Sequence, residues 1–284
     1  MSAIKVGIVG TGSVASSVHL PILTRRTDLF EIVALADLNV NAAYALADRF
    51  GISRDVCFAD PKKMIDSKEV DAVLILNSGS HAEVVEMALR AGKTVFCEKP
   101  LAYSRAELKV IEKAKSESGS ALMIGYMKTF DPAVIEAQKA IKTRPRTVDV
   151  LVLHPSGDSQ LVTSDESLNM PKPSAELIEL FTKSRTAVQE DALGKAGAAS
   201  FGNLYSEMVL GSVIHEFSVL RALDIHITEV DHVDRWPAGS ASDSIIIFGR
   251  TADGVRVTVR WFYLDQYPMY QEEIRWVSDE EGHH

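Results

Sequence analysis

Short apolar runs rich in strand-forming residues alternate with helical patterns through the first half of the chain. The runs that predict strands are 4–9, 31–37, 71–76, 93–98 and 121–126, with a weaker one at 55–58. The patterns that predict helices are 13–26, 40–50, 80–91 and 104–118. Continuous apolar strands separated by helices indicate a parallel sheet covered on both faces. We therefore expect a doubly wound α/β fold in this half.

After residue 126 the pattern changes. Helices are predicted over 131–142, 174–193 and 204–223, and strands over 147–154, 244–250, 255–263 and 270–277. The turn "TADG" between two of these strands is typical of a hairpin. We expect an α+β domain with a mainly antiparallel, open sheet. The last four residues, 281–284, resemble a tag remnant, and because the chain stops on a strand we expect the natural protein to be longer.

Composition limits the kinds of partner that the chain can have. A net charge of −9 and the absence of a Lys/Arg cluster argue against a general nucleic-acid binder. No apolar run approaches the roughly 20 residues that span a bilayer, and the first residues lack the pattern of a signal peptide. The two cysteines, Cys57 and Cys97, lie in apolar runs and are expected to be reduced, in a cytoplasmic protein. No histidine or cysteine spacing indicates a metal site.

A glycine motif follows the first strand and opens the first helix: Gly10, Gly12 and Ala15 lie in "GTGSVA". Glycines permit a tight turn and let backbone N–H groups approach a pyrophosphate at the helix N-terminus. Asp37 ends the second strand, 25 residues after Gly12, where a carboxylate can accept hydrogen bonds from a ribose. Because Leu38 follows, no arginine stands ready for a 2′-phosphate, which favours NAD over NADP. The alternative is a structural glycine turn beside a solvated aspartate.

The strand around residues 94–97 ends abruptly in Glu98, Lys99 and Pro100. Ligands bind beyond the carboxyl ends of the strands in an open parallel sheet, and Asn77 follows another such strand end. A lysine that is partly desolvated beside a cofactor would have a lowered pKa and could move protons near neutral pH. From position alone, Lys99 could equally extend into solvent at the strand tip.

Three segments, "GIVGTGSVASSVHLPIL", "HAEVVEMALRAGKTVFCEKPLA" and "GYMKTFDPAV", together resemble the Gfo/Idh/MocA family of NAD(P)-dependent sugar and polyol oxidoreductases. The resemblance implies that Lys99 lies between nicotinamide and substrate and assists proton transfer from the substrate hydroxyl. It implies that Glu98 contacts the nicotinamide end of the pocket and that the Lys99–Pro100 peptide bond is often cis. We therefore expect a dinucleotide-binding Rossmann domain over 1–126 and a substrate-binding and oligomerisation domain over 127–280.

The resemblance extends to "VLGSVIHEFSVLRAL", in which His215 would bind a substrate hydroxyl or act with Lys99 as acid and base. Read alone, His215 borders an apolar helix stripe and could be structural. The segment departs from the family, which often has aspartates where this chain has Gly211 and Ser218, and an arginine where it has Thr129. Leu76-Asn77-Ser78 replaces a usual Thr-Pro-Asn. The carboxylates that could substitute for the missing one are Glu207, Glu216 and Asp191.

The predicted site combines these positions. Lys99 and His215 are the expected catalytic residues, and Lys99, His154, Tyr205 and His215 are the expected substrate contacts, although His154 and Tyr205 could also be buried structural residues. The expected cofactor contacts are Gly10, Thr11, Gly12, Ser13, Val14, Asp37, Leu38, Asn77, Ser78, His81, Glu98 and Lys99.

The leading hypothesis is hydride transfer between NAD and a sugar, polyol or related carbonyl compound. One alternative is a hydrolase or lyase that uses tightly bound NAD transiently. Another is a non-catalytic NAD-binding regulator, which the residues Gly211 and Ser218 favour. The expected partner is a carbohydrate-like small molecule, with no nucleic acid or membrane, and the resemblance implies a homodimer or homotetramer.

Overall fold

A computed structural model describes residues 2–155, 171–236, 243–280 and 282–283 of the chain. The protein divides into two compact units, each made of two separate stretches of sequence. The first unit comprises Met1–Gly125 and Ser164–Leu210, and the second comprises Tyr126–Thr163 and Gly211–His284. The expected division of roles between residues 1–126 and 127–280 stays a prediction.

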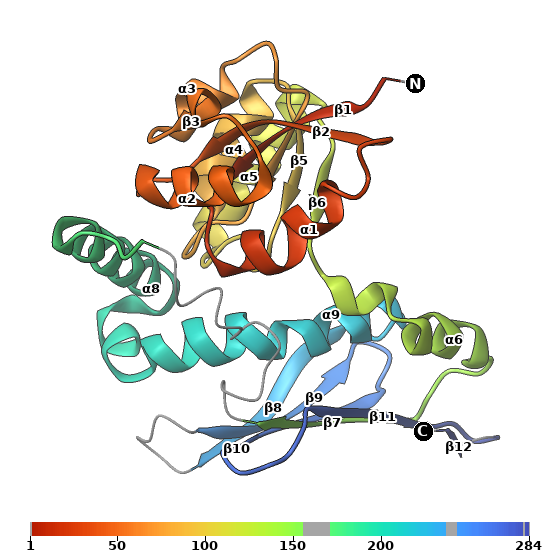
Figure 1. Cartoon of the computed structure of the whole chain (residues 1–284). Helices are drawn as coiled ribbons and strands as arrows, with labels where there is room; N and C mark the ends of the chain where they lie inside the picture. Colours follow the sequence, from red (N-terminus) through yellow and green to blue (C-terminus); the bar gives the residue numbers. More distant parts are fainter. Residues whose placement is uncertain (1, 156–170, 237–242, 281, 284) are drawn as a thin grey trace. The chain divides into compact units, whose positions relative to one another are not determined.

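The first unit is built on a parallel sheet of six strands, in the order β3-β2-β1-β4-β5-β6 (Figure 1). All neighbouring strands in this sheet run parallel. The strands are β1 (Ile4–Val9), β2 (Phe30–Ala36), β3 (Cys57–Phe58), β4 (Ala72–Ile75), β5 (Thr94–Cys97) and β6 (Leu122–Ile124). This order, with helices between strands, confirms the predicted doubly wound fold.

Successive strand residues face opposite sides of this sheet and enter different apolar clusters, as the pleat requires. Val73 and Ile75 belong to one cluster, together with Leu89 of α4. Leu74 and Leu76 belong with a second cluster, which contains Leu46 of α2. Both faces are therefore covered, which explains why the strands are apolar throughout. The helices of this part are η1 (Ala15–His19), α1 (Leu20–Leu23), α2 (Val40–Phe50), η2 (Arg54–Val56), α3 (Pro61–Ile65), α4 (Ala82–Arg90) and α5 (Arg105–Ser118).

The first helix differs from the prediction. Instead of one α-helix over 13–26, the helical residues run from Ser13 through the π-helical turn η1 into the short α1 and end at Leu23. Pro21, just after the π-helical turn, lacks the N–H that donates to the preceding turn inside a helix. The irregular turn lies directly after the glycine motif.

The second unit contains a sheet of six strands, in the order β12-β11-β7-β10-β9-β8. Only β7 and β10 pair in parallel; the other neighbours are antiparallel. The strands are β7 (Thr147–Pro155), β8 (Ile227–Trp236), β9 (Ser244–Thr251), β10 (Arg256–Leu264), β11 (Gln271–Val277) and β12 (Gly282–His283). The mainly antiparallel sheet and the β9–β10 hairpin are confirmed. Gly282 and His283, expected to be part of a tag remnant, pair with β11.

One face of this sheet is buried and the other is polar. Along β10, Val257, Val259 and Trp261 are buried, whereas the intervening Arg256 and Arg260 lie on the other face. Trp261 donates a hydrogen bond from Nε1 to Ser212 Oγ at 2.9 Å, which ties the sheet to the segment before α9. The helical elements of this part of the chain are η3 (Met127–Phe130), α6 (Pro132–Ala140) and α9 (Ile214–Ala222).

Two helical segments precede α9 in the sequence. They are α8 (Ala175–Asn203), which is interrupted at Gly194 by a non-helical φ of 70°, and the π-helical η6 (Leu204–Val213). The sequence predicts two helices here, over 174–193 and 204–223; the structure extends the first to Asn203 and makes the second π-helical before α9.

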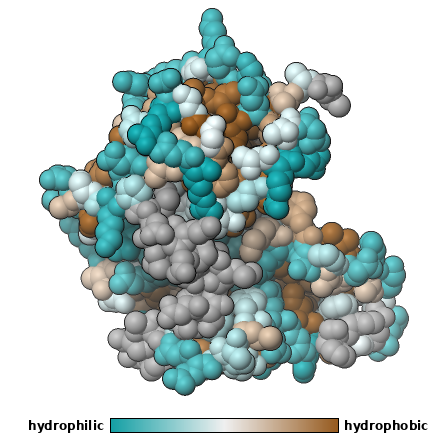
Figure 2. Space-filling view, viewed as in Figure 1, coloured by the Kyte–Doolittle hydropathy of each residue, from teal (hydrophilic) through white to brown (hydrophobic). Residues whose placement is uncertain are grey.

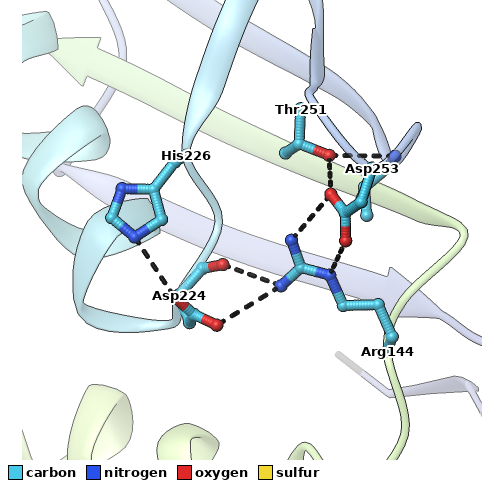
Figure 3. Close-up of polar contacts among 6 residues, drawn as sticks. Arg144, Asp224, His226, Thr251 and Asp253 are labelled. Carbon is cyan, nitrogen blue, oxygen red and sulfur yellow. Dashed lines mark hydrogen bonds and ion pairs between the residues drawn. The ribbon is translucent and has the colours of Figure 1, made fainter.

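A cluster of polar side chains joins three loops of the second unit (Figure 3). Arg144 donates to Asp253 Oδ2 at 2.7 Å through Nε and to the Asp224 carbonyl at 2.7 Å through a terminal nitrogen. His226 Nε2 lies 3.2 Å from Asp224 Oδ1. Asp224 has a φ of 60°, the one positive φ outside glycine among the described residues. Arg144 thus connects the entry to β7 with the α9–β8 loop and the β9–β10 turn.

The visible surface is mostly hydrophilic, with scattered hydrophobic patches (Figure 2). Among the apolar side chains that remain exposed are Met127 and Phe130 of η3. Within the described ranges, no helix has both the length and the apolarity that a membrane crossing needs.

Candidate functional site

The glycine loop between β1 and η1 is shaped by contacts that exclude larger residues. Gly10 has a φ of +90°, and a Cβ at this position would lie 2.3 Å from the backbone nitrogen of Asn77. Gly12, by contrast, has no atom of the described residues, its chain neighbours aside, within 4 Å of the position that a Cβ would occupy. Gly10 therefore lets two strand-end loops touch, whereas Gly12 leaves open space over the loop. Ser13 and Val14 follow as the first helical residues.

Asp37 fixes this loop to the end of β2. Its Oδ2 accepts hydrogen bonds from the backbone nitrogen of Thr11 at 2.8 Å and from Thr11 Oγ1 at 2.9 Å. Its Oδ1 accepts from the backbone nitrogen of Asn39 at 2.8 Å. An ionised carboxylate offers about four acceptor positions, so these three bonds leave capacity for one more donor. Leu38 beside it is exposed and carries no charge.

The ends of β4 and β5 are joined through His81. Its Nδ1 lies 2.6 Å from the carbonyl oxygen of Pro100, and its Nε2 lies 2.6 Å from that of Asn77. The residue is only 2 % exposed, so its ring braces the two loops from inside the fold. Ser78 is exposed next to it. Contact of His81 with a cofactor stays a prediction, and the geometry favours a supporting role.

Asn77 has an orphaned polar atom. Its side-chain nitrogen donates to the carbonyl of Ser78 at 3.1 Å, while its buried Oδ1 has no hydrogen-bond partner among the described residues. A buried acceptor without a donor costs free energy unless a bound group satisfies it. With the open space over Gly12 and the spare acceptor position on Asp37, this atom fits a dinucleotide lying along the strand ends.

Glu98 at the end of β5 is held on both carboxylate oxygens. Its Oε1 lies 2.9 Å from His19 Nε2, and its Oε2 accepts the backbone N–H of Lys99 at 3.2 Å. Burial alone would raise the pKa of Glu98, but the hydrogen bonds and charges of His19 and Lys99 together lower that pKa below its ordinary value. Glu98 is therefore an oriented anion at the strand end.

Lys99 follows directly, half-buried, and its peptide bond to Pro100 is cis, as the resemblance implies. Nearby, Tyr205 donates its hydroxyl to the carbonyl of Tyr103 at 2.5 Å, and burial raises the pKa of Tyr205. Tyr205 thus belongs to the first unit, where it contacts the loop that begins with Lys99–Pro100. Its expected contact with substrate stays a prediction.

In the second unit, His215 lies in the first turn of α9 and is largely buried. Ser218 Oγ donates to the His215 carbonyl at 2.6 Å, so this serine, inside α9, bonds back to the backbone of its own helix. Of the carboxylates expected to substitute near His215, Glu207 lies 3.1 Å from Arg185. Glu216 is engaged by Lys128. Neither of these two contacts orients the His215 ring.

Lys128 lies at the centre of a buried charged cluster. Its Nζ lies 2.7 Å from Glu216 Oε1 and 2.7 Å from Glu272 Oε2, and it donates to Tyr270 Oη. Burial disfavours the charged amine, but the two carboxylates raise the pKa of Lys128 above its ordinary value. Burial raises the pKa of Glu216 despite the nearby ammonium. Its Oε2 has no hydrogen-bond partner among the described residues.

His154 ends β7 among aromatic rings. Its ring centroid lies 4.9 Å from that of Trp261, and it stacks on Tyr263 at 5.9 Å and meets Tyr270 edge-on at 5.8 Å. Its Nδ1 lies 2.8 Å from the carbonyl of Pro155. Burial, with a smaller contribution from Lys128, lowers the pKa of His154, so the neutral ring, with its proton on Nδ1, is favoured. A flat, apolar and partly polar surface of this kind suits a sugar-like ring.

Sequence reasoning missed four of these residues: His19, Lys128, Tyr270 and Glu272. A histidine in the mostly apolar "SVHLPIL" and a lysine four residues after the end of β6 were visible signals. Their partners could not be read from the sequence, because His19 and Glu98 are 79 positions apart and Lys128 and Glu216 are 88 apart.

Residues 4–126 match a family described as "Oxidoreductase family, NAD-binding Rossmann fold", named GFO_IDH_MocA. Over these residues the chain matches the Gfo/Idh/MocA oxidoreductases. The matched residues carry the glycine loop, Asp37, Asn77 and the Glu98–Lys99–Pro100 element. The predicted recognition, and with it the NAD-binding fold, is confirmed.

Curated relatives include inositol 2-dehydrogenases. The protein from Azotobacter vinelandii is 28 % identical over 273 residues, which cover 93 % of this chain and 68 % of the relative. The protein from Pseudomonas savastanoi is 34 % identical over 154 residues, covering 54 % of this chain and 45 % of the relative. Inositol 2-dehydrogenase 3 from Saccharopolyspora erythraea is 37 % identical over 140 residues, covering 49 % and 40 %. The matched segments thus span less than half the length of the last two relatives.

Solved structures share the fold over almost the whole chain. The myo-inositol dehydrogenase from Lactobacillus casei, in complex with NAD(H) and myo-inositol, aligns with a TM-score of 0.73 and 20 % identity, covering 99 % of this chain and 73 % of that one. The scyllo-inositol dehydrogenase from the same organism aligns with a TM-score of 0.69 and 18 % identity, covering 99 % and 75 %. At this identity the likeness concerns the fold.

Proposed function

We propose that this protein is an NAD-dependent dehydrogenase that oxidises a secondary hydroxyl of a polyol or sugar-like ring, or reduces the corresponding ketone. The observation that carries the proposal is the placement of Lys99 directly after Glu98 at the end of β5, in the same unit as the glycine loop and Asp37. The family match and the printed names of the relatives support the substrate class.

The residues proposed to hold NAD are those at the strand ends of the first unit. Backbone groups of Thr11, Gly12, Ser13 and Val14 would face the pyrophosphate, because nothing else fills the space over Gly12. Asp37 would accept a hydrogen bond from the adenosine ribose with its remaining capacity, as Gly10 keeps the loop tight. Further contacts would come from Leu38, Asn77, Ser78, His81 and Glu98.

When bound, NAD supplies the acceptor for a hydride from the substrate carbon. In the oxidation, Lys99 in its neutral form would take the proton that leaves the substrate hydroxyl, so the C–H bond electrons depart as hydride and the C–O bond becomes a carbonyl. The reverse reaction returns the proton from the ammonium form of Lys99.

The second unit is proposed to bind the substrate ring. His215 would hydrogen-bond a substrate hydroxyl or share the proton transfer with Lys99, and His154 would offer its ring face. The proposal assigns domain roles accordingly: cofactor binding to residues 1–126 and substrate binding to residues 127–280. Tyr205 is proposed as a further substrate contact because its ring lies 6.5 Å from that of Tyr103 near the Lys99 loop.

The test is a screen of inositols, sugars, polyols and sugar acids for NADH formation, followed by Lys99→Met on the best substrate. We expect turnover to fall by roughly 10²–10⁴-fold, the usual contribution of a positioned acid or base, with NAD affinity within a few-fold of wild type. Lys109→Met, at an exposed lysine on α5, is the control and should change neither quantity. Normal turnover by Lys99→Met would exclude Lys99 as the proton-transfer group.

A second candidate function is a non-catalytic NAD-binding regulator. It is favoured by Gly211 and Ser218, which stand where the resemblance leads us to expect aspartates. A regulator would bind NAD with ordinary affinity but give no NADH with any member of the screen. A third candidate, transient oxidation by tightly bound NAD, would show bound cofactor after purification and product without net NADH.

Location and assembly complete the proposal. We infer a cytoplasmic protein from its two free thiols, Cys57 and Cys97. We infer a homodimer or homotetramer formed through the polar face of the second sheet, where Phe248 is exposed. Light scattering after size-exclusion chromatography measures the assembly directly; a monomer at micromolar concentration would exclude it.

A further inference from the structure

A histidine–carboxylate pair lies beside the proposed proton-transfer residue, and its histidine has no role in the function assigned above. His19 Nε2 is 2.9 Å from Glu98 Oε1, and their side chains are 15 % and 22 % exposed. Glu98 precedes Lys99 in the chain. Because both side chains are largely screened from solvent, their interaction is stronger than that of a surface pair.

Three independent features of the first unit build this pair. The π-helical turn η1 ends at His19, and such turns widen a helix at functional positions. The ring of His19 packs edge-on against Phe96 with centroids 5.4 Å apart. Gly125 leaves room for the carboxylate, because a Cβ there would lie 3.2 Å from Glu98 Oε1 and 3.1 Å from the Phe96 ring. These three features together hold the Glu98 carboxylate in one position.

The fixed carboxylate matters because of its neighbour. A carboxylate within about 4–6 Å favours the charged form of a lysine, typically by 1–3 pK units. The charge of Lys99 is one of the smaller causes that lower the pKa of Glu98. His19 competes for that anion by holding one of its oxygens, while the Lys99 backbone N–H holds the other. Without His19, the carboxylate would be free to turn toward the amine.

We propose that His19 is a positioning residue that holds the Glu98 carboxylate and so limits how strongly this anion stabilises the charged form of Lys99. The benefit of this arrangement rests on the proposed function, because Lys99 can take a proton from a substrate hydroxyl only as a neutral amine. Its physical content, a coupling between His19 and Lys99 through Glu98, is independent of any reaction.

The experiment measures the reactivity of the Lys99 amine as a function of pH, in the full chain without cofactor or substrate. Trinitrobenzenesulfonate modifies neutral amines, and digestion followed by mass spectrometry gives the pH midpoint for each lysine. We expect His19→Leu to raise the Lys99 midpoint by about one pH unit. His19→Gln, which keeps a donor of similar reach, should stay close to wild type. Exposed Lys109 in the same digest is the internal control and should not move.

A double-mutant cycle decides whether the effect passes through Glu98. Glu98→Gln removes the anion and should lower the Lys99 midpoint; adding His19→Leu to Glu98→Gln should then change nothing further. If His19→Leu fails to fold, His19→Asn replaces it, because its amide is too short to reach the carboxylate. An unchanged midpoint in His19→Leu or His19→Asn would overturn the proposal, and so would an equal shift in the Glu98→Gln background or at Lys109.

Turnover separates this inference from the proposed function. With an active substrate, His19→Leu should shift the alkaline-side pH dependence of kcat in the same direction as the labelling midpoint, with the KM for NAD within a few-fold. If no substrate is turned over, the proposed function fails while the labelling result still stands or falls on its own.

Discussion

Lys128 and Glu216 form an ion pair in the interior of the second unit, with 2.7 Å between Nζ and Oε1 and no exposed side-chain surface on Glu216. The pair joins η3 to α9, and Glu272 brings β11 to the same amine. A single charge thereby holds η3 and β11 to α9, the helix that carries His215. Such a pair contributes little net stability when intact, but removing one partner leaves a buried charge uncompensated.

Lys128→Met should therefore destabilise the protein by about 3–5 kcal/mol. Replacing both partners in Lys128→Met/Glu216→Met should recover most of that loss, since an apolar pair carries no desolvation cost. Urea denaturation monitored by circular dichroism gives the free energies of unfolding. Lys139→Met is the matched control: its pair with Glu136 is exposed, and its loss should cost less than about 1 kcal/mol. Equal effects of Lys128→Met and Lys139→Met would contradict the expectation.

Replacing either loop glycine by alanine should weaken NAD binding, but only the change at Gly10 should also reduce the stability of the fold. Gly10→Ala forces a methyl group against the backbone of Asn77 at a positive φ, so we expect a loss of about 1–3 kcal/mol in stability together with weakened NAD binding. Gly12→Ala meets no protein atom, so folding should be unaffected while NAD affinity falls more than about tenfold, because the methyl occupies the space proposed for the pyrophosphate. Thermal denaturation and calorimetric titration with NAD separate the two effects.

Gly92→Ala is the control for backbone strain. Gly92 also has a positive φ, of 73°, and open space around a Cβ, but it precedes β5 at the opposite end of the strand from Lys99. It should lose about 1 kcal/mol of stability and keep full NAD affinity. If Gly12→Ala binds NAD as tightly as wild type does, the pyrophosphate of NAD does not lie over this loop.

Asp37 should matter for cofactor binding in two ways, through the loop and through the ribose. Asp37→Ala removes the acceptor for both Thr11 donors, so we expect NAD affinity to fall by about ten- to a hundredfold. Asp37→Asn keeps one acceptor and should lie between Asp37→Ala and wild type. Asp37→Arg should weaken NAD and improve the ratio of NADP to NAD affinity. If Asp37→Arg leaves that ratio as it was, Asp37 does not read the ribose.

The Arg144–Asp253 contact predicts a pH dependence of stability (Figure 3). The guanidinium of Arg144 holds the pKa of Asp253 below its ordinary value, so the folded state loses this proton more readily than the unfolded state does. The contact should thus stabilise the protein above about pH 4, the ordinary value for an aspartate, and lose its effect as the pH falls below that value.

The measurement compares wild type with Asp253→Asn in urea at several pH values. The difference in unfolding free energy should be largest above pH 5 and shrink toward pH 3. Asp265→Asn, at an exposed aspartate in the loop after β10, should show no such trend. A gap that widens on acidification would mean that the sign of the coupling is wrong.

The first unit was predictable because its signals are local. Apolar runs such as 4–9 and 71–76 face helices on both sides, so period and composition alone indicate buried parallel strands. The glycine motif and Asp37 lie at fixed distances within one βαβ segment. The hairpin at "TADG" was likewise local, and its register confirms it.

Other features depended on contacts between distant residues. Strand β8 was missed because almost all of its side chains are exposed and many are charged, as suits an edge strand. The π-helical η1 and η6 were predicted as ordinary helices, since π turns follow from tertiary packing rather than from local propensity. The pairs His19–Glu98 and Lys128–Glu216 needed the fold to bring them together.

Strand β7 lies between β10 and β11 in its sheet, although its residues precede theirs by about a hundred positions. During synthesis the backbone N–H and C=O groups on both edges of β7 therefore have no partner strand until β10 and β11 have left the ribosome. An unpaired β7, with the sequence "VDVLVL", can form a sheet with β7 of another incomplete chain. We expect chains cut before β9 to aggregate in a sedimentation assay, and the timing of translation and chaperone capture to limit the yield of this protein.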